Sequence, residues 1–396
     1  MNETPNSNRK HIAIYGKTNA GKSSLLNAII GQDVSLVSEI KGTTTDPVNK
    51  AMELIPLGPV LFIDTAGLKD TSKLGEIREG RTLEILKRTD FAIYVMDIKD
   101  SDENLEKETI ESFKKYNIPY ITVINKIDTV GEDKIKDVKK KYPKAIFVSA
   151  YKEENILELK EEIIKRVKED EEEPSIIGDL LPYNSKVVLV VPVDSEAPKG
   201  RIILPQVQCI RDALDHGIKS YVVRDLELKT ALLDIKDVDL VITDSQAFKK
   251  VNKIVPKNIS LTSFSILFAR HKGDLNTFVK GVEKIESLKE NSRILICESC
   301  THNTSHEDIG RVKIPKMLES HVGKKLNFEF KAGYDFKEDI EKYDLVIHCG
   351  SCMLTRKVML NRINICNQKG VSITNYGVVI AYLTGILDRS LEIFNK

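Results

Sequence analysis

The chain has 396 residues, with 60 basic and 59 acidic side chains, so its formal net charge at pH 7 is only +1. That length exceeds one ordinary hydrophobic core and predicts two or three domains. The balanced charge argues against binding to nucleic acid or to an anionic membrane through overall charge. We see no signal peptide and no membrane-length apolar run. We therefore expect a cytoplasmic protein whose cysteines stay reduced.

Residues 9–170 alternate short β-rich apolar runs with helical patterns. The runs "HIAIYG", "VLFIDTAG", "FAIYVMD" and "PYITVINKID" predict strands, and "KSSLLNAII" and "REGRTLEILKR" predict helices between them. This alternation is typical of an α/β fold with a parallel sheet covered on both faces. An amphipathic helix then ends in an acidic run before Pro174, which we interpret as a solvated helix end leading into a linker.

The alternation restarts after the linker, with strands expected at "KVVLVVPV", "SYVVRD", "DLVITDS" and "ISLTSF". A third region carries "RILICES", "YDLVIHC" and "GVSITNY". We therefore expect a nucleotide-binding domain at 1–174 and two further α/β domains at 175–267 and 268–396. No internal repeat with a short fixed period is evident.

The stretch "GKTNAGKSS" follows an expected strand and opens an expected helix, which is the context of a phosphate-binding P-loop. Its glycines let backbone N–H groups face the phosphates. Lys22 supplies charge to the β- and γ-phosphates, and Ser23 can bind Mg²⁺. The residues that we assign to the nucleotide here share this loop: Gly16, Ala20, Gly21, Lys22, Ser23 and Ser24.

Two later stretches complete the phosphate end of the expected site. "DTAG" closes a strand, so that Asp64 can hold Mg²⁺ through water and the N–H of Gly67 can meet the γ-phosphate. "KGTTTDP" lies between this motif and the P-loop and offers a threonine for the metal.

The motif "NKID" predicts recognition of guanine. The carboxylate of Asp128 can accept two hydrogen bonds, from N1–H and the 2-amino group, which adenine does not offer as a pair. "SA" ends the next strand and suits a backbone contact to O6 of guanine. We assign four further residues to the nucleotide: Asn125, Lys126, Ser149 and Ala150. Four motifs in this order predict a GTPase.

This half resembles the TrmE–Era class of translation-factor GTPases. The resemblance implies that Thr44 binds Mg²⁺ and that Asn19 ligates a potassium ion that stands in for an arginine finger. Leu68 replaces the water-orienting glutamine of Ras-like enzymes. Glu76 is spaced like the catalytic glutamate of the TrmE group, although a surface glutamate fits the same spacing. The catalytic candidates are therefore Lys22, Thr44, Gly67 and Glu76.

The C-terminal region carries two groups of soft ligands, Cys300 with His302 and His348 with Cys349 and Cys352. A redox pair, a structural zinc site and an iron–sulfur cluster all use such residues. The spacing does not separate zinc from iron–sulfur, and buried thiols without a metal remain a fourth interpretation. We interpret the other cysteines as buried thiols: Cys209, Cys297 and Cys366.

"CTH" followed by "HCGSC" resembles the signature of the HydF family of FeFe-hydrogenase maturation GTPases. The resemblance implies a 4Fe–4S cluster held by the three cysteines, with an exchangeable fourth iron site. It also implies a transient diiron subcluster precursor, delivered to apo-FeFe-hydrogenase with the help of the radical-SAM maturases HydE and HydG. The middle domain would form a homodimer.

Two hypotheses follow. In the first, the chain is a maturation GTPase and iron–sulfur scaffold that uses GTP/GDP, Mg²⁺, K⁺ and a 4Fe–4S cluster, without membrane or nucleic acid. In the second, it is a TrmE/Era-like GTPase acting on RNA with a zinc-binding C-terminal module. That module would need a basic surface with stacking aromatics, which the C-terminal third does not show clearly.

Overall fold

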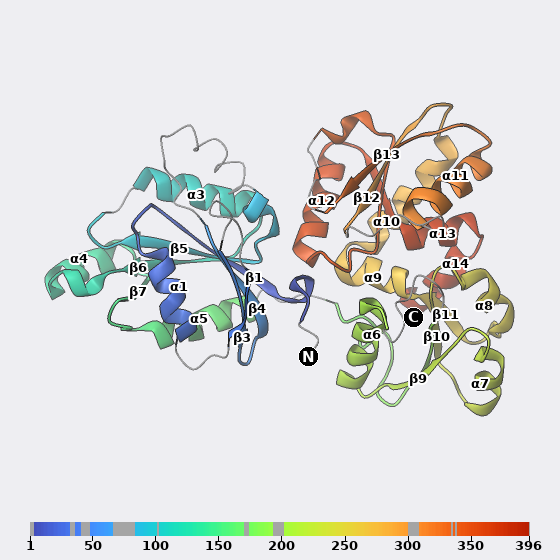
Figure 1. Cartoon of the computed structure of the whole chain (residues 1–396), viewed down its shortest axis with the longest axis horizontal. Coiled ribbons are helices and arrows are strands. Elements are labelled where there is room, and N and C mark those ends of the chain that lie inside the picture. The colour runs from blue at the N-terminus through green and yellow to red at the C-terminus, as the bar shows by residue number, and fades with distance from the viewer. Residues whose placement is uncertain are drawn as a thin grey trace. The chain divides into compact units, whose positions relative to one another are not determined.

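The computed structural model describes residues 4–31, 36–40, 48–65, 84–100, 103–169, 174–192, 202–299, 309–333, 336 and 339–395. The chain forms two compact units, Met1–Glu172 and Glu173–Lys396 (Figure 1). Within the described ranges, no helix is both long and apolar enough to cross a membrane.

The first unit is built on one sheet, whose described strands run in the order β2-β3-β4-β1-β5-β6-β7. Its strands are β1 (Lys10–Gly16), β2 (Leu36–Ile40), β3 (Val48–Leu54), β4 (Gly58–Asp64), β5 (Phe91–Asp97), β6 (Tyr120–Asn125) and β7 (Ile146–Phe147). Its helices are η1 (Asn6–Asn8), α1 (Lys22–Gly31), α3 (Glu103–Lys115), η2 (Ile127–Thr129), α4 (Glu132–Lys141) and α5 (Ile156–Glu169).

Helices cover both faces of this sheet, which explains why its central strands are apolar runs. Side chains of α1 and α5 pack with one face of β1 and β5, as Leu26 and Leu159 do. Phe113 of α3 packs on the other face, where its ring lies 5.1 Å from that of Tyr15. The expected α/β fold is thereby confirmed.

The expectation of an all-parallel sheet is wrong at one edge. β3 pairs antiparallel with both β2 and β4. Only the turn Ile55–Leu57 joins β3 to β4, and a connection that short can link antiparallel strands only. Leu57 N donates to Leu54 O at 2.6 Å, and Gly58 takes a φ of 96°, which closes this turn.

The second unit contains two parallel sheets, ordered β11-β10-β8-β9 and β13-β12-β14-β15 in its described part. The first sheet consists of β8 (Lys186–Val190), β9 (Lys219–Val223), β10 (Leu240–Thr243) and β11 (Ser260–Ser263). The second consists of β12 (Arg293–Glu298), β13 (Asn327–Ala332), β14 (Leu345–His348) and β15 (Ser372–Asn375). The helices are α6 (Leu204–Asp215), α7 (Leu228–Asp234), α8 (Phe248–Ile254), α9 (Phe264–Lys272), α10 (Leu275–Val282), η3 (Glu283–Ser287), η4 (Ile309–Lys313), α11 (Ile314–Val322), η5 (Ile340–Lys342), α12 (Arg356–Gln368), α13 (Tyr376–Leu383), α14 (Leu387–Leu391) and η6 (Glu392–Asn395).

These two sheets repeat one arrangement, which the sequence did not reveal. In both, the first strand in the chain lies between the second and the third, and the fourth flanks the third. The details also correspond. Asp239, just before β10, accepts from Lys186 N at 2.8 Å. Asp344, just before β14, accepts from Arg293 N at the same distance, 2.8 Å. Parallel pairing of β12 with β14 makes their carboxyl ends neighbours, with Cys297 paired to His348.

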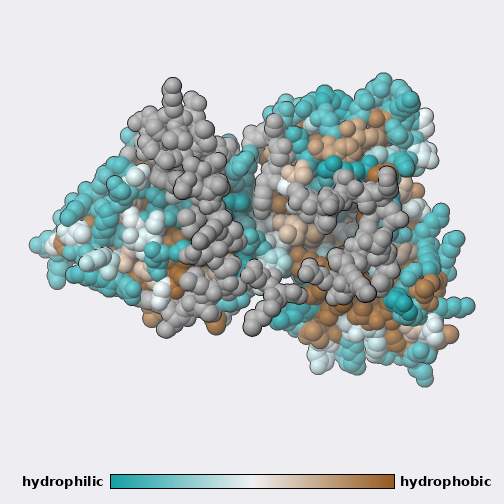
Figure 2. All heavy atoms as spheres, viewed as in Figure 1, coloured by the Kyte–Doolittle hydropathy of each residue, from teal (hydrophilic) through white to brown (hydrophobic). Residues whose placement is uncertain are grey.

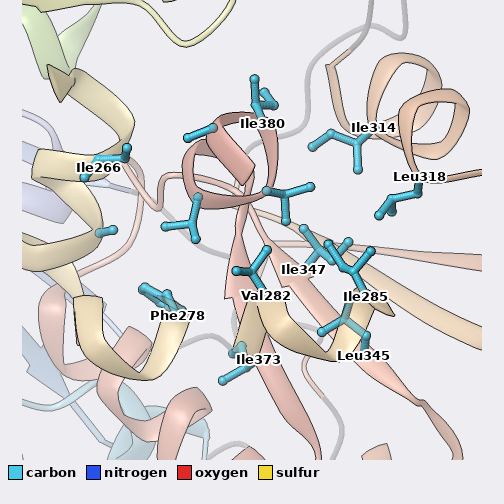
Figure 3. Packing of buried hydrophobic residues seen from close by; sticks show 14 of the residues in the cluster. Ile266, Phe278, Val282, Ile285, Ile314, Leu318, Leu345, Ile347, Ile373 and Ile380 are labelled. Carbon is cyan, nitrogen blue, oxygen red and sulfur yellow. The ribbon is translucent and has the colours of Figure 1, made fainter. Parts of the chain in front are cut away.

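One hydrophobic core joins the two sheets, and both lie in the compact unit Glu173–Lys396. It includes Val188 and Val241 from one sheet and Ile294 and Ile347 from the other. Figure 3 shows side chains of α9 to α11, η3, β14, β15 and α13 meeting in this core. Full burial of each such aliphatic side chain contributes roughly 1.5–3 kcal/mol of transfer free energy.

Candidate functional site

The P-loop connects β1 to α1 and is held in shape by its glycines. At Gly16, with φ of 144°, an added Cβ would lie 2.2 Å from Val95 O. At Gly21, with φ of 91°, it would lie 2.4 Å from Asn125 Nδ2. A side chain at Gly16 would therefore collide with the backbone of β5, and one at Gly21 would collide with the side-chain amide of Asn125. This fixes the loop against β5 and β6.

The ammonium group of Lys22 lies inside this loop. Its Nζ donates to Gly16 O and to Lys17 O, each at 3.0 Å. Burial lowers the pKa of Lys22, while the nearby charge of Asp64 opposes that shift. The group is thus placed to exchange these carbonyls for phosphate oxygens.

Two oxygen ligands of the expected magnesium site meet at the end of β4. Ser23 Oγ donates to Asp64 Oδ2 at 2.5 Å. The pairing of Ile14 with Asp64 between β1 and β4 brings them together. Hydroxyl and carboxylate oxygens are the hard ligands that Mg²⁺ prefers, so the residues fit the ion. Three other expected residues lie outside the described ranges: Thr44, Gly67 and Glu76.

Asn125 ties the guanine motif to the P-loop. Its Nδ2 donates to Ala20 O at 3.1 Å, and its Oδ1 accepts from Ala150 N at 3.0 Å. One buried amide thus connects the loops that follow β1, β6 and β7. The structure therefore places the P-loop next to both base-binding motifs.

Lys126 makes a second connection across the base-binding region. Its Nζ donates to Asn19 O at 2.6 Å and forms an ion pair with Asp97 at 2.7 Å. Lys126 and Asn19 both have a positive φ, of 66° and 65°. Ser24 lies exposed in the first turn of α1.

The second expected site lies at the carboxyl ends of β12 and β14. Cys349 and Cys352 are half-buried thiols that follow β14. Ser299 N and Ser299 Oγ lie 3.1 Å and 3.0 Å from Cys349 Sγ. Cys349 N donates to Cys297 O at 2.9 Å. Ser299, the residue that precedes Cys300 in the sequence, therefore contacts Cys349.

The donor set of this region suits a soft metal. Two thiols three residues apart are typical ligands of zinc or of an iron–sulfur cluster, so the described residues fit either group. Cys300 and His302 lie outside the described residues. Within the described ranges, no group of three or more potential metal ligands is found.

His348 is fully buried, and protein groups bind both of its ring nitrogens. Arg362 Nη1 lies 2.5 Å from Nε2. Nδ1 lies 3.0 Å from Cys349 O and 3.2 Å from Ser351 Oγ. Burial, followed by the charge of Arg362, lowers the pKa of His348 to about 3. The imidazole is therefore neutral and held in place by its neighbours.

The remaining described cysteines are buried, as the sequence predicted. Burial raises the pKa of Cys297 and of Cys366 to about 12, even though Arg362 acts in the opposite direction on both. Sequence reasoning missed Arg362 itself. The available signal was its place on the buried face of α12, four residues before Cys366.

Family models assign both units. The model "50S ribosome-binding GTPase" matches residues 11–126. The model "Hydrogen maturase F dimerization domain" matches residues 176–273, and "Hydrogen maturase F tetramerization domain" matches residues 276–393. The two maturase models together cover more than half of the chain, in the expected order after the GTPase domain. The chain belongs to the hydrogen maturase F family. It carries a P-loop GTPase domain, a type of domain that hydrolyses GTP, and two oligomerization domains.

Curated relatives that are named as GTPases match part of this chain. GTPase Der of Persephonella marina is 45% identical over 123 residues, which is 30% of this chain and 27% of the relative. The tRNA modification GTPase MnmE of Caldicellulosiruptor saccharolyticus is 36% identical over 160 residues, 39% of this chain and 33% of the relative. The match thus spans a third or less of each of these two proteins. An Aquifex aeolicus Era structure with GDP and aluminium fluoride is 19% identical, with a TM-score of 0.33, covering 82% of this chain and 92% of that one.

Proposed function

We propose that this chain is a GTP-hydrolysing scaffold that binds a 4Fe–4S cluster and carries a diiron subcluster precursor to an apo-FeFe-hydrogenase. The family membership supports the hydrogenase context. The observation that carries the proposal is the contact of Ser299 with Cys349 Sγ, at 3.1 Å from its N–H. This contact brings Ser299, the residue before Cys300, against Cys349.

For the GTPase reaction, Lys22 and the P-loop amides bind the β- and γ-phosphates, and Asp128 reads guanine. Ser23 and Asp64 would hold Mg²⁺, which neutralises charge on the phosphates when bound. We assign Thr44, Gly67 and Glu76 to the γ-phosphate side of the reaction and Asn19 to a potassium ion. We further propose that the GTP or GDP state orders or releases the segments around Thr44 and Gly67.

For the iron–sulfur part, Cys300, Cys349 and Cys352 would supply three thiolates. Three protein thiolates on a four-iron cluster leave one iron open to exchangeable ligands, which is what a carrier needs. We propose HydE, HydG and apo-FeFe-hydrogenase as the partners. His302 stays a candidate for the neighbourhood of the fourth iron.

We also propose a homodimer built on the sheet edge at β9. β9 is the end strand of its sheet and exposes Val222 to 47%. Exposed apolar side chains surround it on α6, on α7 and just before α7: Val207, Leu214, Leu226 and Leu233. Figure 2 shows hydrophobic surface gathered in the region of α6 and β9. An open, apolar strand edge is suited to pairing with a second copy.

Anaerobic reconstitution with iron and sulfide tests the function. Wild-type protein should bind about four irons per chain and give a 4Fe–4S EPR signal after reduction. Cys300→Ser, Cys349→Ser and Cys352→Ser should each lose most of that iron. Cys209→Ser, which alters a buried thiol on α6, is the matched control. Stoichiometric zinc without an iron–sulfur signal would refute the proposal and favour a GTPase with a zinc module.

A further inference from the structure

Arg362 is a buried arginine that joins three segments beside the cysteine loop. Its side chain lies on α12 and is 4% exposed. Nη1 lies 2.5 Å from His348 Nε2, at the end of β14. Nη2 donates to Gly333 O at 2.6 Å, just after β13. The guanidinium lies 5.1 Å from the ring centroid of Phe336.

The bond to Arg362 fixes the tautomer of His348. A guanidinium can only donate, so Nε2 must be the acceptor and the ring proton must sit on Nδ1. That N–H faces Cys349 O at 3.0 Å. Ser351 Oγ lies 3.3 Å from the same carbonyl. The peptide that follows Cys349 is therefore held by a chain of bonds that starts at Arg362.

Backbone bonds also hold the same loop. Cys349 N donates to Cys297 O at 2.9 Å, and Leu354 N donates to Ser351 O at 3.0 Å. Ser351 is buried and takes a φ of 57°, a left-handed conformation that a serine adopts only when its surroundings impose it. The turn between the two thiols therefore depends on its neighbours for its shape.

We propose that Arg362 is a positioning residue for the cysteine loop, acting through His348, so that the Cys349 and Cys352 thiols are preorganised for a metal cluster. The inference rests on the proposed function in one respect, the identity of the cluster. In this role His348 is a support of the loop and contributes no bond to iron. Arg362 acts on the site through His348, as residues that hydrogen-bond to metal ligands or their neighbours do in other metal sites.

Arginine suits this role better than lysine. Its planar fork presents separate N–H groups to two acceptors in fixed directions, here an imidazole nitrogen and a backbone carbonyl. Its charge is also permanent, and it lies beside the cysteine loop through its contact with His348. Such a charge should stabilise the more negative, reduced form of a bound cluster.

The first experiment uses the apo chain and needs no cluster. Hydrogen exchange is measured at the amides of Cys349 and Leu354 in wild type, Arg362→Gln and Arg362→Lys. We expect Arg362→Gln to speed exchange about tenfold or more, the effect of losing a charge-assisted hydrogen bond. The exchange rate in Arg362→Lys should lie between those of the wild type and Arg362→Gln. Unchanged exchange in Arg362→Gln would overturn the proposal.

Arg389→Gln is the matched control for that experiment. Arg389 also donates to backbone carbonyls in the second unit, at 3.1 Å to Asn252 O and 3.0 Å to Val255 O. The Arg389→Gln substitution should leave amide exchange in the cysteine loop unchanged. Equal acceleration by both substitutions would mean general destabilisation and would overturn the specific role of Arg362.

The second experiment uses reconstituted protein. Arg362→Gln should release iron to a chelator faster than wild type and shift the cluster's midpoint potential to a more negative value. Arg362→Lys should keep the potential closer to wild type. His348→Gln, which retains one donor and one acceptor, should keep the iron content. Pulsed EPR of the wild type should show no directly coordinated nitrogen from His348, and a coupling that His348→Gln abolishes would overturn the proposal. A wild type that takes up no cluster would refute the proposed function, while the exchange experiment still decides the role of Arg362.

Discussion

Ser149 Oγ donates to Asp128 Oδ1 at 2.6 Å. This bond joins the loop after β7 to the loop after β6 and orients the Asp128 carboxylate. Ser149 Oγ also accepts from Lys152 N at 3.1 Å, which fixes the hydroxyl in turn. The carboxylate that should read guanine is thus held in place before any nucleotide binds.

Replacing Asp128 by Asn should exchange guanine selectivity for xanthine selectivity. The carboxylate accepts from N1–H and the 2-amino group, whereas an amide can donate to the 2-oxo group of xanthine. The amide keeps one acceptor for N1–H but turns a donor toward the 2-amino group, and the negative charge is lost. GTP binding should therefore weaken about a hundredfold or more. Competition of GDP and XDP for a fluorescent nucleotide measures this. Ser149→Ala, which removes only the hydrogen bond that orients Asp128, should weaken GTP binding less than Asp128→Asn does. Unchanged GTP preference in Asp128→Asn would contradict the assignment.

GTP turnover should be faster in KCl than in NaCl, because we assign the Asn19 side chain to a potassium ion. Asn19→Ala should lose this response. Since φ at Asn19 is 65°, alanine also adds backbone strain. Asn19→Gly removes the side chain without that strain and keeps the carbonyl that accepts from Lys126. Steady-state phosphate release in both salts is the measurement. Equal wild-type rates, or a potassium response in Asn19→Gly, would count against the site.

Val222→Asp should weaken the dimer, because it places a charge on the exposed edge strand β9. Light scattering after size exclusion should show a smaller species at low micromolar concentration. Ile55→Asp is the control, since Ile55 is 83% exposed but belongs to the first unit. A dimer as stable in Val222→Asp as in Ile55→Asp would exclude β9 from the interface.

The second unit should lose stability in acid, because protonation of Asp179 removes its ion pair with Arg270. Arg270 Nη1 donates to Asp179 Oδ1 at 3.0 Å and holds residues 174–181 on α9. Partial burial opposes ionisation of Asp179, but the bonds from Arg270 and Ser175 outweigh it, so its pKa lies below the usual 3.8. A lowered pKa stabilises the folded state above pH 3.8, and that contribution disappears as the pH falls through the folded pKa.

Asp179→Asn should therefore unfold at lower urea concentration than wild type at pH 7, and the difference should shrink below about pH 4. The pair is partly exposed, so we expect a modest effect that high salt reduces. Urea titrations at pH 7 and in acid, with and without 1 M salt, provide the measurement. A difference that stays constant down to pH 3 would show that another contact is responsible.

Part of the fold was predictable because its signals are local. Apolar runs with β-branched residues predicted β1, β4, β5 and β6, and each gave a strand near the expected place. β3 was missed, because "VNKAMEL" mixes polar and apolar residues as a strand at the margin of a sheet does. The repeat of the two sheets in the second unit was missed as well. It resides in strand order and in positions such as Asp239 and Asp344, with too little sequence likeness between the halves to detect.

By itself, the sequence determined the P-loop, the guanine motif and the Cys349–Cys352 pair, because a few neighbouring residues and their backbone conformation define each of them. Only the tertiary structure decided which of these groups meet. Parallel pairing of β12 with β14 sets Ser299 against Cys349, although they lie 50 positions apart. The packing of α12 carries Arg362 to His348. Strand register and helix packing join residues that are distant along the chain, and local patterns do not contain that information.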